Sequence, residues 1–585
     1  MEAITVNPFG RSPRVAAAEP ANSEVPATED VRSSAAVAAP AVAESWGYLW
    51  DAWQRGVLFL DVMRQRADNM LEHEREGLPP LLAFRHETIL DGRRLPRPAN
   101  YALLQITEVD GDRACDCVDP DKPPVVIVDP RAGHGPGIGG FKRDSEVGVA
   151  LRVGHPVYFV IFFPEPVVGQ TLDDVQHVLR CFVEEVARRH NGRQPILYGN
   201  CQAGWALTLL AADCRGLAGP VVLNGSPLSY WAGESGVNPM RVAGGLLGGA
   251  WLTHFVADLG AGRFDGAWLA QNFENLQPEK SLWEKHARLF THIDTERKRF
   301  LEFERWWNGF YFLSREEILA IVENLFIGNR LERREYRVCD GCYADLRRIQ
   351  NPIIVFASYG DNITPPHQAL GWIPAVYKDT DDLKRAGQRI VYLTNPHVGH
   401  LGIFVSAKVA RFEHGAILEG LDEIQALEPG LYEMKIDNPT GDPDCPSSLY
   451  GRRFEARQVE ELPFAPDNEA FERVREVSET NESLYRAFVS PWVRAVANPW
   501  SAEVMKWMHP MRTSRYLMSG AFNPWMRGLA VLADAVAQDR RPLRDDHPLM
   551  FQEKARIEEI SMAIELSRKL RDAGYEAMFS ALYAN

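Results

Sequence analysis

A cysteine in the stretch Gly199–Gly204 is the first candidate for chemistry, because it lies where two predicted elements meet. An apolar strand, Pro195–Tyr198, comes before it, and a periodic apolar helix begins at Trp205. Small residues on either side of Cys201 suit a sharp turn, since bulky side chains there would strike the neighbouring strand or helix. The N-terminus of a helix beneath the sulfur would favour the reactive thiolate. The pattern therefore predicts a nucleophile elbow, although buried free cysteines are often inert packing groups.

A thiol nucleophile needs a base, and the base needs an acceptor that fixes its tautomer. The predicted strand Pro352–Ala357 is followed by Asp361, and the strand Gln388–Leu393 is followed by His400. The carboxyl ends of parallel strands meet at one edge of a sheet, where such folds place their chemistry. We therefore predict that His400 is the general base for Cys201 and that Asp361 orients it.

Each of these two assignments has an alternative reading. Asp361 could serve only as a helix cap, a common role for aspartate. His397 competes with His400 as the base. We prefer His400 because it stands just before the closing helix, with Gly399 beside it.

The oxyanion produced by attack on a carbonyl needs N–H donors. One is expected from the backbone of Gln202, directly after the nucleophile. The second is expected from the glycine-rich loop that follows the buried strand 124–129, with Gly133, His134 and Gly135 as the candidates.

The same loop also matches a dinucleotide-binding pattern. Gly135, Gly137 and Gly140 have G-x-G-x-x-G spacing, and Glu165 follows near the end of the next strand. The first glycine stands well beyond the strand, however, and Pro136 removes an N–H that would face phosphate. We therefore expect neither a nucleotide nor another organic cofactor.

The composition is that of a globular protein, with 585 residues, 45% hydrophobic and 24% charged. The formal net charge is −15 without a long basic block, which argues against nucleic acid as a partner. No apolar run reaches the roughly 18 residues that span a bilayer, and no secretory signal is recognised. The eight cysteines have no histidines nearby at zinc spacing, so we expect no metal site and a reduced, cytoplasmic protein.

Strands that alternate with helices predict an α/β fold with a mostly parallel, doubly wound sheet. The expected organisation begins with a disordered tail at residues 1–44 and an amphipathic helix at 45–80. The core follows in two parts, 81–223 and 350–415, with a helical cap insertion at 224–349 between them. A mostly helical C-terminal extension covers residues 416–585. The aromatic helices at both ends lead us to expect a homo-oligomer.

Three stretches resemble the α/β-hydrolase family of poly(3-hydroxyalkanoate) synthases. These are the box around Cys201, the segment Asp361–Pro365, and Gly399-His400-Leu401. The long terminal extensions, including Trp50–His73, resemble an uncharacterised synthase-like branch of that family. The resemblance implies an α/β-hydrolase fold and a triad of Cys201, His400 and Asp361.

The resemblance also implies an activity. Cys201 would attack the thioester of a (hydroxy)acyl-CoA, and the acyl-cysteine would pass to a hydroxyl acceptor, without a metal or an organic cofactor. A polyester granule surface is then a further candidate partner. Two other readings stay open. One is a thioesterase or esterase, in which water takes the acyl group. The other is a non-catalytic protein that binds a granule or membrane through its Trp-rich helices near residues 492–532.

Overall fold

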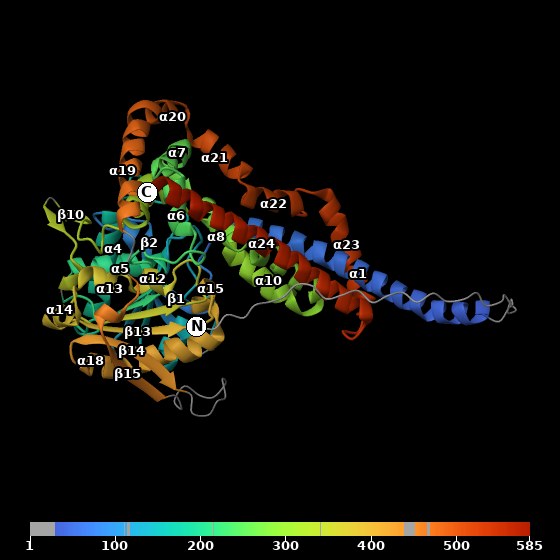
Figure 1. Cartoon of the computed structure of the whole chain (residues 1–585), viewed down its shortest axis with the longest axis horizontal. Helices are drawn as coiled ribbons and strands as arrows, with labels where there is room; N and C mark the ends of the chain where they lie inside the picture. Colours follow the sequence, from blue (N-terminus) through green and yellow to red (C-terminus); the bar gives the residue numbers. More distant parts are fainter. Residues whose placement is uncertain are drawn as a thin grey trace, which may run out of the picture.

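The computed structural model describes residues 30–109, 112–113, 118–214, 216–339, 341–437, 451–464 and 468–584. Its centre is a sheet in the order β1-β2-β5-β4-β6-β7-β12-β13-β14-β15 (Figure 1). The seven strands from β5 to β14 in this order run parallel: β4 (Val125–Val128), β5 (Val157–Phe162), β6 (Ile196–Asn200), β7 (Val221–Asn224), β12 (Ile353–Ser358), β13 (Arg389–Asn395) and β14 (Gly430–Asp437). The predicted α/β-hydrolase fold with a mostly parallel sheet is confirmed.

Antiparallel strands border the parallel part of the sheet on both sides. On one side are β1 (Arg85–Asp91) and β2 (Tyr101–Val109), with the short β3 (Asp112–Arg113) paired to β2. On the other side is β15 (Gly451–Arg457), which pairs with β14. The sheet thus extends beyond residue 415, where the sequence reading had ended the core. The sequence predicted an antiparallel pair at residues 84–90 and 101–107, which β1 and β2 confirm. The strands β14 and β15 were not predicted, because they alternate polar and apolar residues, whereas β4, β5, β6 and β12 are unbroken buried runs.

Helices cover both faces of the parallel strands, as right-handed crossovers require. The crossovers between the first strands are α3 (Glu146–Arg152), α4 (Leu172–Arg189) and α5 (Gln202–Asp213). A capping box of Thr171 and Asp174 fixes the start of α4, and its apolar face joins one of the two large cores. The second core lies on the opposite face of the sheet. Later helices complete the layers: α12 (Pro366–Leu370), α13 (Trp372–Val376), α14 (Thr380–Arg385), α15 (His400–Val405), α16 (Ala407–Val409), α17 (Gly415–Glu419) and α18 (Leu421–Ala426).

The long insertion lies between β7 and β12, where the cap was expected. It is mostly helical, with α6 (Met240–Leu246), α7 (Trp251–Leu259), α8 (Ala267–Leu276), η2 (Glu279–Glu284), α9 (Lys285–Thr291), α10 (Ile293–Trp307), α11 (Arg315–Ile321) and η3 (Val322–Ile327). A small antiparallel ribbon, β8 (Arg263–Asp265) with β9 (Phe312–Ser314), ties its middle together. A second ribbon, β10 (Arg337–Cys339) with β11 (Cys342–Tyr343), contains the disulfide-bonded Cys342, so the expectation of reduced cysteines fails there.

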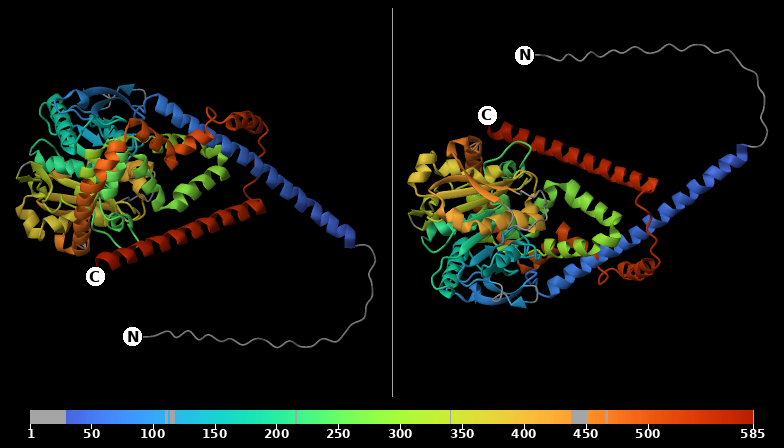
Figure 2. Two further views of the ribbon diagram at one scale, coloured as in Figure 1. Left: turned by 90° about the horizontal axis from the view of Figure 1, so that it is seen from above. Right: turned by 90° about the horizontal axis from the view of Figure 1, so that it is seen from below.

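Helices from both ends of the chain form an arm beside the α/β body. Figure 2 shows α1 (Asp30–Arg75) and α24 (Pro548–Tyr583) running out from the body, with α10 lying between them. Between β15 and α24, the C-terminal extension forms the helices α19 (Asn468–Leu484), η8 (Tyr485–Val489), α20 (Ser490–Val496), α21 (Pro499–Met508), α22 (Pro510–Met518) and α23 (Pro524–Gln538). The helix α1 packs on α10, α22 and α23. It begins upstream of the start expected near residue 45, and residues 1–29 of the predicted tail lie outside the described part of the chain.

No single helix in the described ranges has the length and hydropathy needed to cross a membrane. The helices α6 and α7 meet these criteria only as a pair, and they are bent by 83° relative to each other.

Candidate active site

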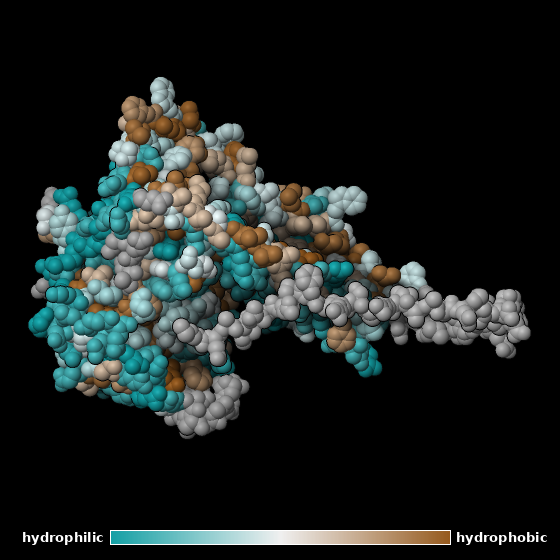
Figure 3. Space-filling model, in the orientation of Figure 1, coloured by the Kyte–Doolittle hydropathy of each residue, from teal (hydrophilic) through white to brown (hydrophobic). Residues whose placement is uncertain are grey.

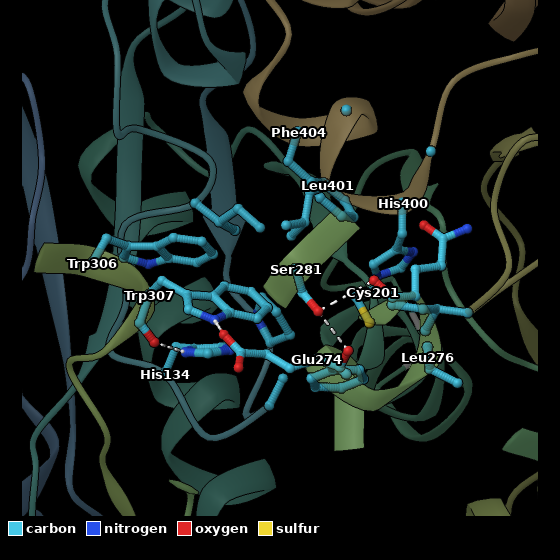
Figure 4. A pocket seen from close by; sticks show the side chains of 18 of the residues that line it. His134, Cys201, Glu274, Leu276, Ser281, Trp306, Trp307, His400, Leu401 and Phe404 are labelled. Atoms are coloured by element: carbon cyan, nitrogen blue, oxygen red, sulfur yellow. Dashed lines mark hydrogen bonds between the residues drawn. The ribbon is translucent and has the colours of Figure 1, made fainter. Parts of the chain in front are cut away.

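Cys201 occupies the turn between β6 and α5 in a strained backbone conformation, with φ 50° and ψ −125°. A positive φ is uncommon for a residue other than glycine, and it presents the side chain at the top of the sheet. The backbone N–H of Cys201 donates to the carbonyl of Asn224 on the neighbouring strand at 2.8 Å, which fixes the turn. Its side chain is buried and reaches the wall of a cavity (Figure 4).

The glycines around the elbow are required by close contacts. A Cβ on Gly199 would lie 2.6 Å from the Cα of Gly204, and a Cβ on Gly204 would lie 2.0 Å from the Oγ of Ser226. Ala203 is itself buried, so a larger side chain there would meet the packed core. Trp205, the next residue, is fully buried and packs edge-on against Tyr336. The expected reason for small residues in this turn therefore holds in three dimensions.

His400 and Asp361 are joined by a hydrogen bond at the carboxyl edge of the sheet. The Nδ1 of His400, the first residue of α15, lies 2.7 Å from the Oδ2 of Asp361. The other carboxylate oxygen of Asp361 accepts the backbone N–H groups of Ile363 at 2.8 Å and Thr364 at 2.9 Å. These bonds hold a fully buried carboxylate in one orientation and leave the Nε2 of His400 for another partner.

That other partner is Cys201. Burial alone would lower the pKa of His400, but the charge of Asp361 and the charge of Cys201, with hydrogen bonds to both, raise it to about 10. A protonated imidazole beside the sulfur stabilises negative charge on it. The structure thus brings together Cys201, His400 and Asp361, whereas His397 is exposed and has no part in this arrangement.

The predicted oxyanion loop contacts the site, and the three candidate residues in it differ in the surroundings of their backbone N–H groups. Gly135 donates its N–H to the carbonyl of Gly309 at 2.9 Å, so it is not available to a substrate. Gly133 packs against Gly266 of the insertion, where a Cβ would lie 2.2 Å from the Gly266 carbonyl oxygen. In the described part of the chain, the backbone N–H groups of Ala132 and His134 have no acceptor, and both residues line the cavity.

Gln202 lies directly after the nucleophile, at the start of α5, as the oxyanion prediction requires. Its side-chain Oε1 accepts the N–H of Arg131 at 3.4 Å and so links the elbow to the loop after β4. Because the backbone of Gln202 is in the first turn of a helix, its N–H has no intrahelical acceptor. This arrangement suits one donor of an oxyanion hole.

The glycine-rich loop binds a carboxylate of its own chain, which accounts for its glycines. The Oδ2 of Asp129 accepts the N–H of Gly137 at 2.6 Å, and its Oδ1 accepts the N–H of Gly139 at 3.2 Å. The N–H of Gly140 donates to the carbonyl of Gly137. With Gly135 also engaged, the three glycines of the dinucleotide pattern have no free N–H for phosphate. The loop therefore does not have the geometry of a dinucleotide site.

A buried polar network supports the elbow from below. The Nδ2 of Asn200 donates to Glu146 at 2.6 Å and to Asp129 at 3.3 Å, and Asn224 donates to the Oδ1 of Asn200 at 3.1 Å. Burial raises the pKa of Asp129 to about 6, despite its hydrogen bonds, and raises that of Glu146 well above its ordinary value. Since Asn200 directly precedes Cys201, this network fixes the position of Cys201.

A cavity of about 370 Å³ opens above Cys201 and His400. Much of its wall comes from the insertion, between Phe273 and Trp307, and it is mainly apolar, with Phe273, Leu276, Phe303, Trp306, Trp307 and Phe404. Figure 4 shows the two tryptophans on one side of the cavity and Cys201 with His400 on the other. The insertion thus lines much of the cavity that Cys201 reaches.

The His134 side chain packs into the aromatic wall of the cavity, and its ring is uncharged. It stacks on Trp307 with 4.2 Å between ring centroids, and its Nδ1 bonds the Trp307 carbonyl at 2.7 Å. Burial lowers its pKa to about 4, so the ring is neutral near pH 7.

Sequence reasoning missed the polar residues that the insertion places at the cavity, namely Glu274, Ser281 and Lys285. Glu274 accepts a hydrogen bond from the indole N–H of Trp307 at 2.8 Å, and Lys285 pairs with the buried Glu304 at 2.9 Å. No local motif marks these residues, because they reach the site only through the packing of the insertion on the core.

Residues 51–585 match the DUF3141 family, which is described as a protein of unknown function. The chain belongs to this family. The same match covers the core, the insertion and the C-terminal helices of the DUF3141 chain, so these parts occur together as one unit.

Two relatives give the scale of the similarity. The DUF3141 chain is 45% identical over 555 residues to the "uncharacterized protein in ackA 5′ region" of Rhizobium meliloti, which covers 93% of this chain and 75% of that protein. It is 24% identical over 341 residues to the poly(3-hydroxyalkanoate) polymerase subunit PhaC of Haloferax mediterranei, which covers 55% of this chain and 61% of that protein. The chain is thus a distant relative of the polymerase subunit. This relationship supports the family resemblance seen in the sequence, but not a particular activity.

Solved α/β-hydrolases superimpose on part of the chain. An esterase from Thermogutta terrifontis matches with a TM-score of 0.33 and 12% identity, covering 58% of this chain and all of that one. The thioesterase domain from the curacin biosynthetic pathway matches with a TM-score of 0.31 and 10% identity, covering 58% and 99%. These likenesses concern the fold alone.

Proposed function

We propose that the protein is an acyltransferase that forms an acyl-cysteine on Cys201 from a (hydroxy)acyl-CoA thioester and passes the acyl group to a hydroxyl acceptor. One observation carries the proposal: Cys201 stands in a strained elbow beside a His400 that Asp361 orients, at the wall of a mainly apolar cavity. This is the arrangement that nucleophilic acyl transfer needs.

In the first half-reaction, the sulfur of Cys201 attacks the thioester carbonyl, and His400 holds the proton that the thiol has released. The N–H of Gln202 and an N–H of the loop at Ala132 or His134 stabilise the oxyanion. The carbon–sulfur bond to CoA then breaks, and the proton on His400 passes to the leaving thiolate. CoA departs as a thiol, and the acyl group remains on Cys201.

In the second half-reaction, an acceptor hydroxyl attacks the acyl-cysteine. His400 takes the hydroxyl proton as the new carbon–oxygen bond forms, and the bond to Cys201 breaks. The proton returns to the sulfur, so the enzyme is regenerated and the sum is acyl-CoA plus alcohol giving ester plus CoA. A thioester intermediate preserves the activation of the acyl group, which favours transfer over loss.

The cavity supports this choice of substrate. Its aromatic wall suits an acyl chain, and the insertion above Cys201 would exclude the water that competes with a hydroxyl acceptor. The exposed Lys280 at the cavity rim would meet the phosphates of CoA. The distant relationship to a polymerase subunit supports a hydroxyacyl chain as the acceptor. We also propose that the enzyme needs no cofactor.

The test is incubation of purified protein with 3-hydroxybutyryl-CoA and longer 3-hydroxyacyl-CoA thioesters, with free CoA and acyl products measured together. The proposal predicts CoA release with ester-linked oligomer or polymer. CoA release matched by free acid would replace it with a thioesterase. If no thioester releases CoA, the proposed acyltransferase activity is excluded, and the alternative of a non-catalytic binding protein is favoured.

A further inference from the structure

A series of short helices in the C-terminal extension presents tryptophan at regular structural positions. The sequences Ser490-Pro491-Trp492, Asn498-Pro499-Trp500 and Asn523-Pro524-Trp525 open α20, α21 and α23. Proline is favoured in the first turn of a helix, and Asn498 and Asn523 each accept the N–H of the following tryptophan at 3.0 Å. A tryptophan thus stands in the first turn of each of the three helices, and a cap bond fixes the backbone at Trp500 and Trp525.

These indole rings face solvent. Trp492 and Trp500 are each 76% exposed, and Trp525 is 86% exposed. Further apolar side chains of the segment from η8 to α23 are exposed as well, among them Phe488, Val496, Met508, Leu517, Phe522 and Val531. Figure 3 shows apolar side chains gathered along the edge of the molecule that these helices form in Figure 1. We call the outer surface of η8 and α20–α23 the tryptophan ridge. Soluble monomers rarely expose so much apolar surface in one region.

The inner side of the ridge is firmly attached, so the exposed side is not the result of loose packing. Ser490 donates to Asp258 of the insertion at 2.6 Å, and Arg512 forms a two-pronged ion pair with Asp265 at 2.8 Å. Ser519 donates to Asp68 of α1 at 2.5 Å. Polar and charged groups thus fasten one side of these helices to the body and leave the other side apolar.

The charge of the ridge segment is opposite to that of the rest of the chain. Residues 485–538 contain six arginine and lysine residues against two acidic ones, in a protein with a formal net charge of −15. Arg512 and Arg515 face inward, whereas Arg494 and Arg527 are exposed among the apolar side chains. Near an anionic surface, this charge distribution would orient the ridge toward that surface and the acidic body away from it.

We propose that the tryptophan ridge is a peripheral docking surface for an anionic phospholipid membrane. Tryptophan prefers the boundary between headgroups and acyl chains, where its apolar body is buried and its N–H meets polar groups. Helices with Trp, Phe and Leu on one face and basic residues nearby lie in the plane of this boundary without crossing the bilayer. A second copy of the chain would instead have to bring together two ridges of like charge.

The test is co-sedimentation of the full-length protein with vesicles of phosphatidylglycerol and phosphatidylethanolamine, compared with vesicles of phosphatidylcholine. The wild type is expected to sediment with the anionic vesicles and less with the neutral ones. The triple variant Trp492→Ser, Trp500→Ser and Trp525→Ser should lose about tenfold or more of its partition into the anionic vesicles. A matched triple variant on the arm, Trp46→Ser, Leu566→Ser and Leu570→Ser, removes exposed apolar side chains outside the ridge and should bind as the wild type does.

A second measurement uses only the wild type, in case the triple variant fails to fold. Vesicles with bromine-labelled acyl chains should quench part of its tryptophan emission, because the ridge inserts to the depth of the label. Several results would overturn the proposal: no sedimentation of the wild type with anionic vesicles, no quenching, or equal losses in the two triple variants. So would an oligomer that the ridge substitutions dissociate, since that would assign the surface to a second copy.

Discussion

The Nδ1 of His400 lies 2.7 Å from the Oδ2 of Asp361, and the two residues come from the segments that follow two adjacent parallel strands, β13 and β12. Cys201 follows β6 and is brought to the same edge of the sheet. Side chains that are far apart in the sequence thus meet because parallel strands end together. The same order of nucleophile, acid and histidine along the chain occurs in α/β-hydrolases.

Replacement of Asp361 tests whether this pair has a catalytic role. Asp361→Asn removes the charge that holds the proton on His400 and reverses the preferred tautomer, so acyl transfer should fall by about a thousandfold. The measurement is CoA release under saturating thioester. His397→Asn is the matched control, because His397 is an exposed histidine of the same loop and should leave the rate unchanged. Equal rates for wild type and Asp361→Asn would exclude the proposed role.

The same variant changes how stability depends on pH. The pKa of His400 is raised from 6.5 to about 10, so the folded protein binds this proton more tightly than the unfolded chain does. This contribution to stability is complete below about pH 6.5 and is lost as the pH rises through about 10. In Asp361→Asn, the free energy of unfolding should depend less on pH in that window. Denaturant titrations of both proteins at pH 6.5 to 10 measure it.

The elbow should not accept even one additional carbon at Gly204. Gly204→Ala would place a Cβ 2.0 Å from the Oγ of Ser226, and we expect a loss of about 2 kcal/mol in the free energy of unfolding, together with lower activity. Adding Ser226→Gly removes the clashing atoms and should restore part of both. If Gly204→Ala is as stable as the wild type, the elbow is more adaptable than the contacts indicate.

An ion pair between the N-terminal helix and the cap should stabilise the cover of the site. Burial alone would raise the pKa of Glu304 on α10, but Arg66 of α1 and Lys285 lower it to about 2. Arg66→Ala should cost about 3 kcal/mol, because it removes one partner of a buried charge. Its matched control is Arg305→Ala, which breaks pairs with Glu72 and Glu76 between the same two helices at the surface, and which should cost less than about 1 kcal/mol.

The pH dependence of this ion pair follows from the sign of the shift. A carboxylate with a lowered pKa stabilises the fold above its unfolded value of 4.5, and the contribution is lost as the pH falls toward 2. In Arg66→Ala the pKa of the folded-state Glu304 should rise toward 4.5, so less stability should be lost as the pH falls below 4.5. Thermal unfolding of wild type and variant between pH 3 and 7 tests this, and parallel curves would contradict it.

The parallel strands and the meeting of Cys201, Asp361 and His400 could be predicted from the sequence because their signals are local. Unbroken apolar runs give buried strands, and Cys201, Asp361 and His400 stand directly beyond such runs. The last two strands, β14 and β15, were missed because their alternating polar residues also fit irregular segments.

Features that depend on long-range packing were beyond the sequence. The glycine loop was read as a source of oxyanion donors, but Gly135 is engaged by Gly309, which is remote in the chain. The partner of Gly137 and Gly139 is the carboxylate of Asp129, and nothing in the spacing of the glycines distinguishes an internal carboxylate from a phosphate. Likewise, His134 stacks on a tryptophan that only the folded insertion brings to it.

The most direct test of the central claim is the intact mass of the protein after brief exposure to 3-hydroxybutyryl-CoA. The account predicts an added mass equal to one or more hydroxybutyryl units on the wild type, with release of CoA. Cys201→Ala should show neither, while folding with unchanged stability within about 1 kcal/mol. An adduct of the same mass on Cys201→Ala, or CoA release at the wild-type rate, would show that the sulfur of Cys201 is not the nucleophile.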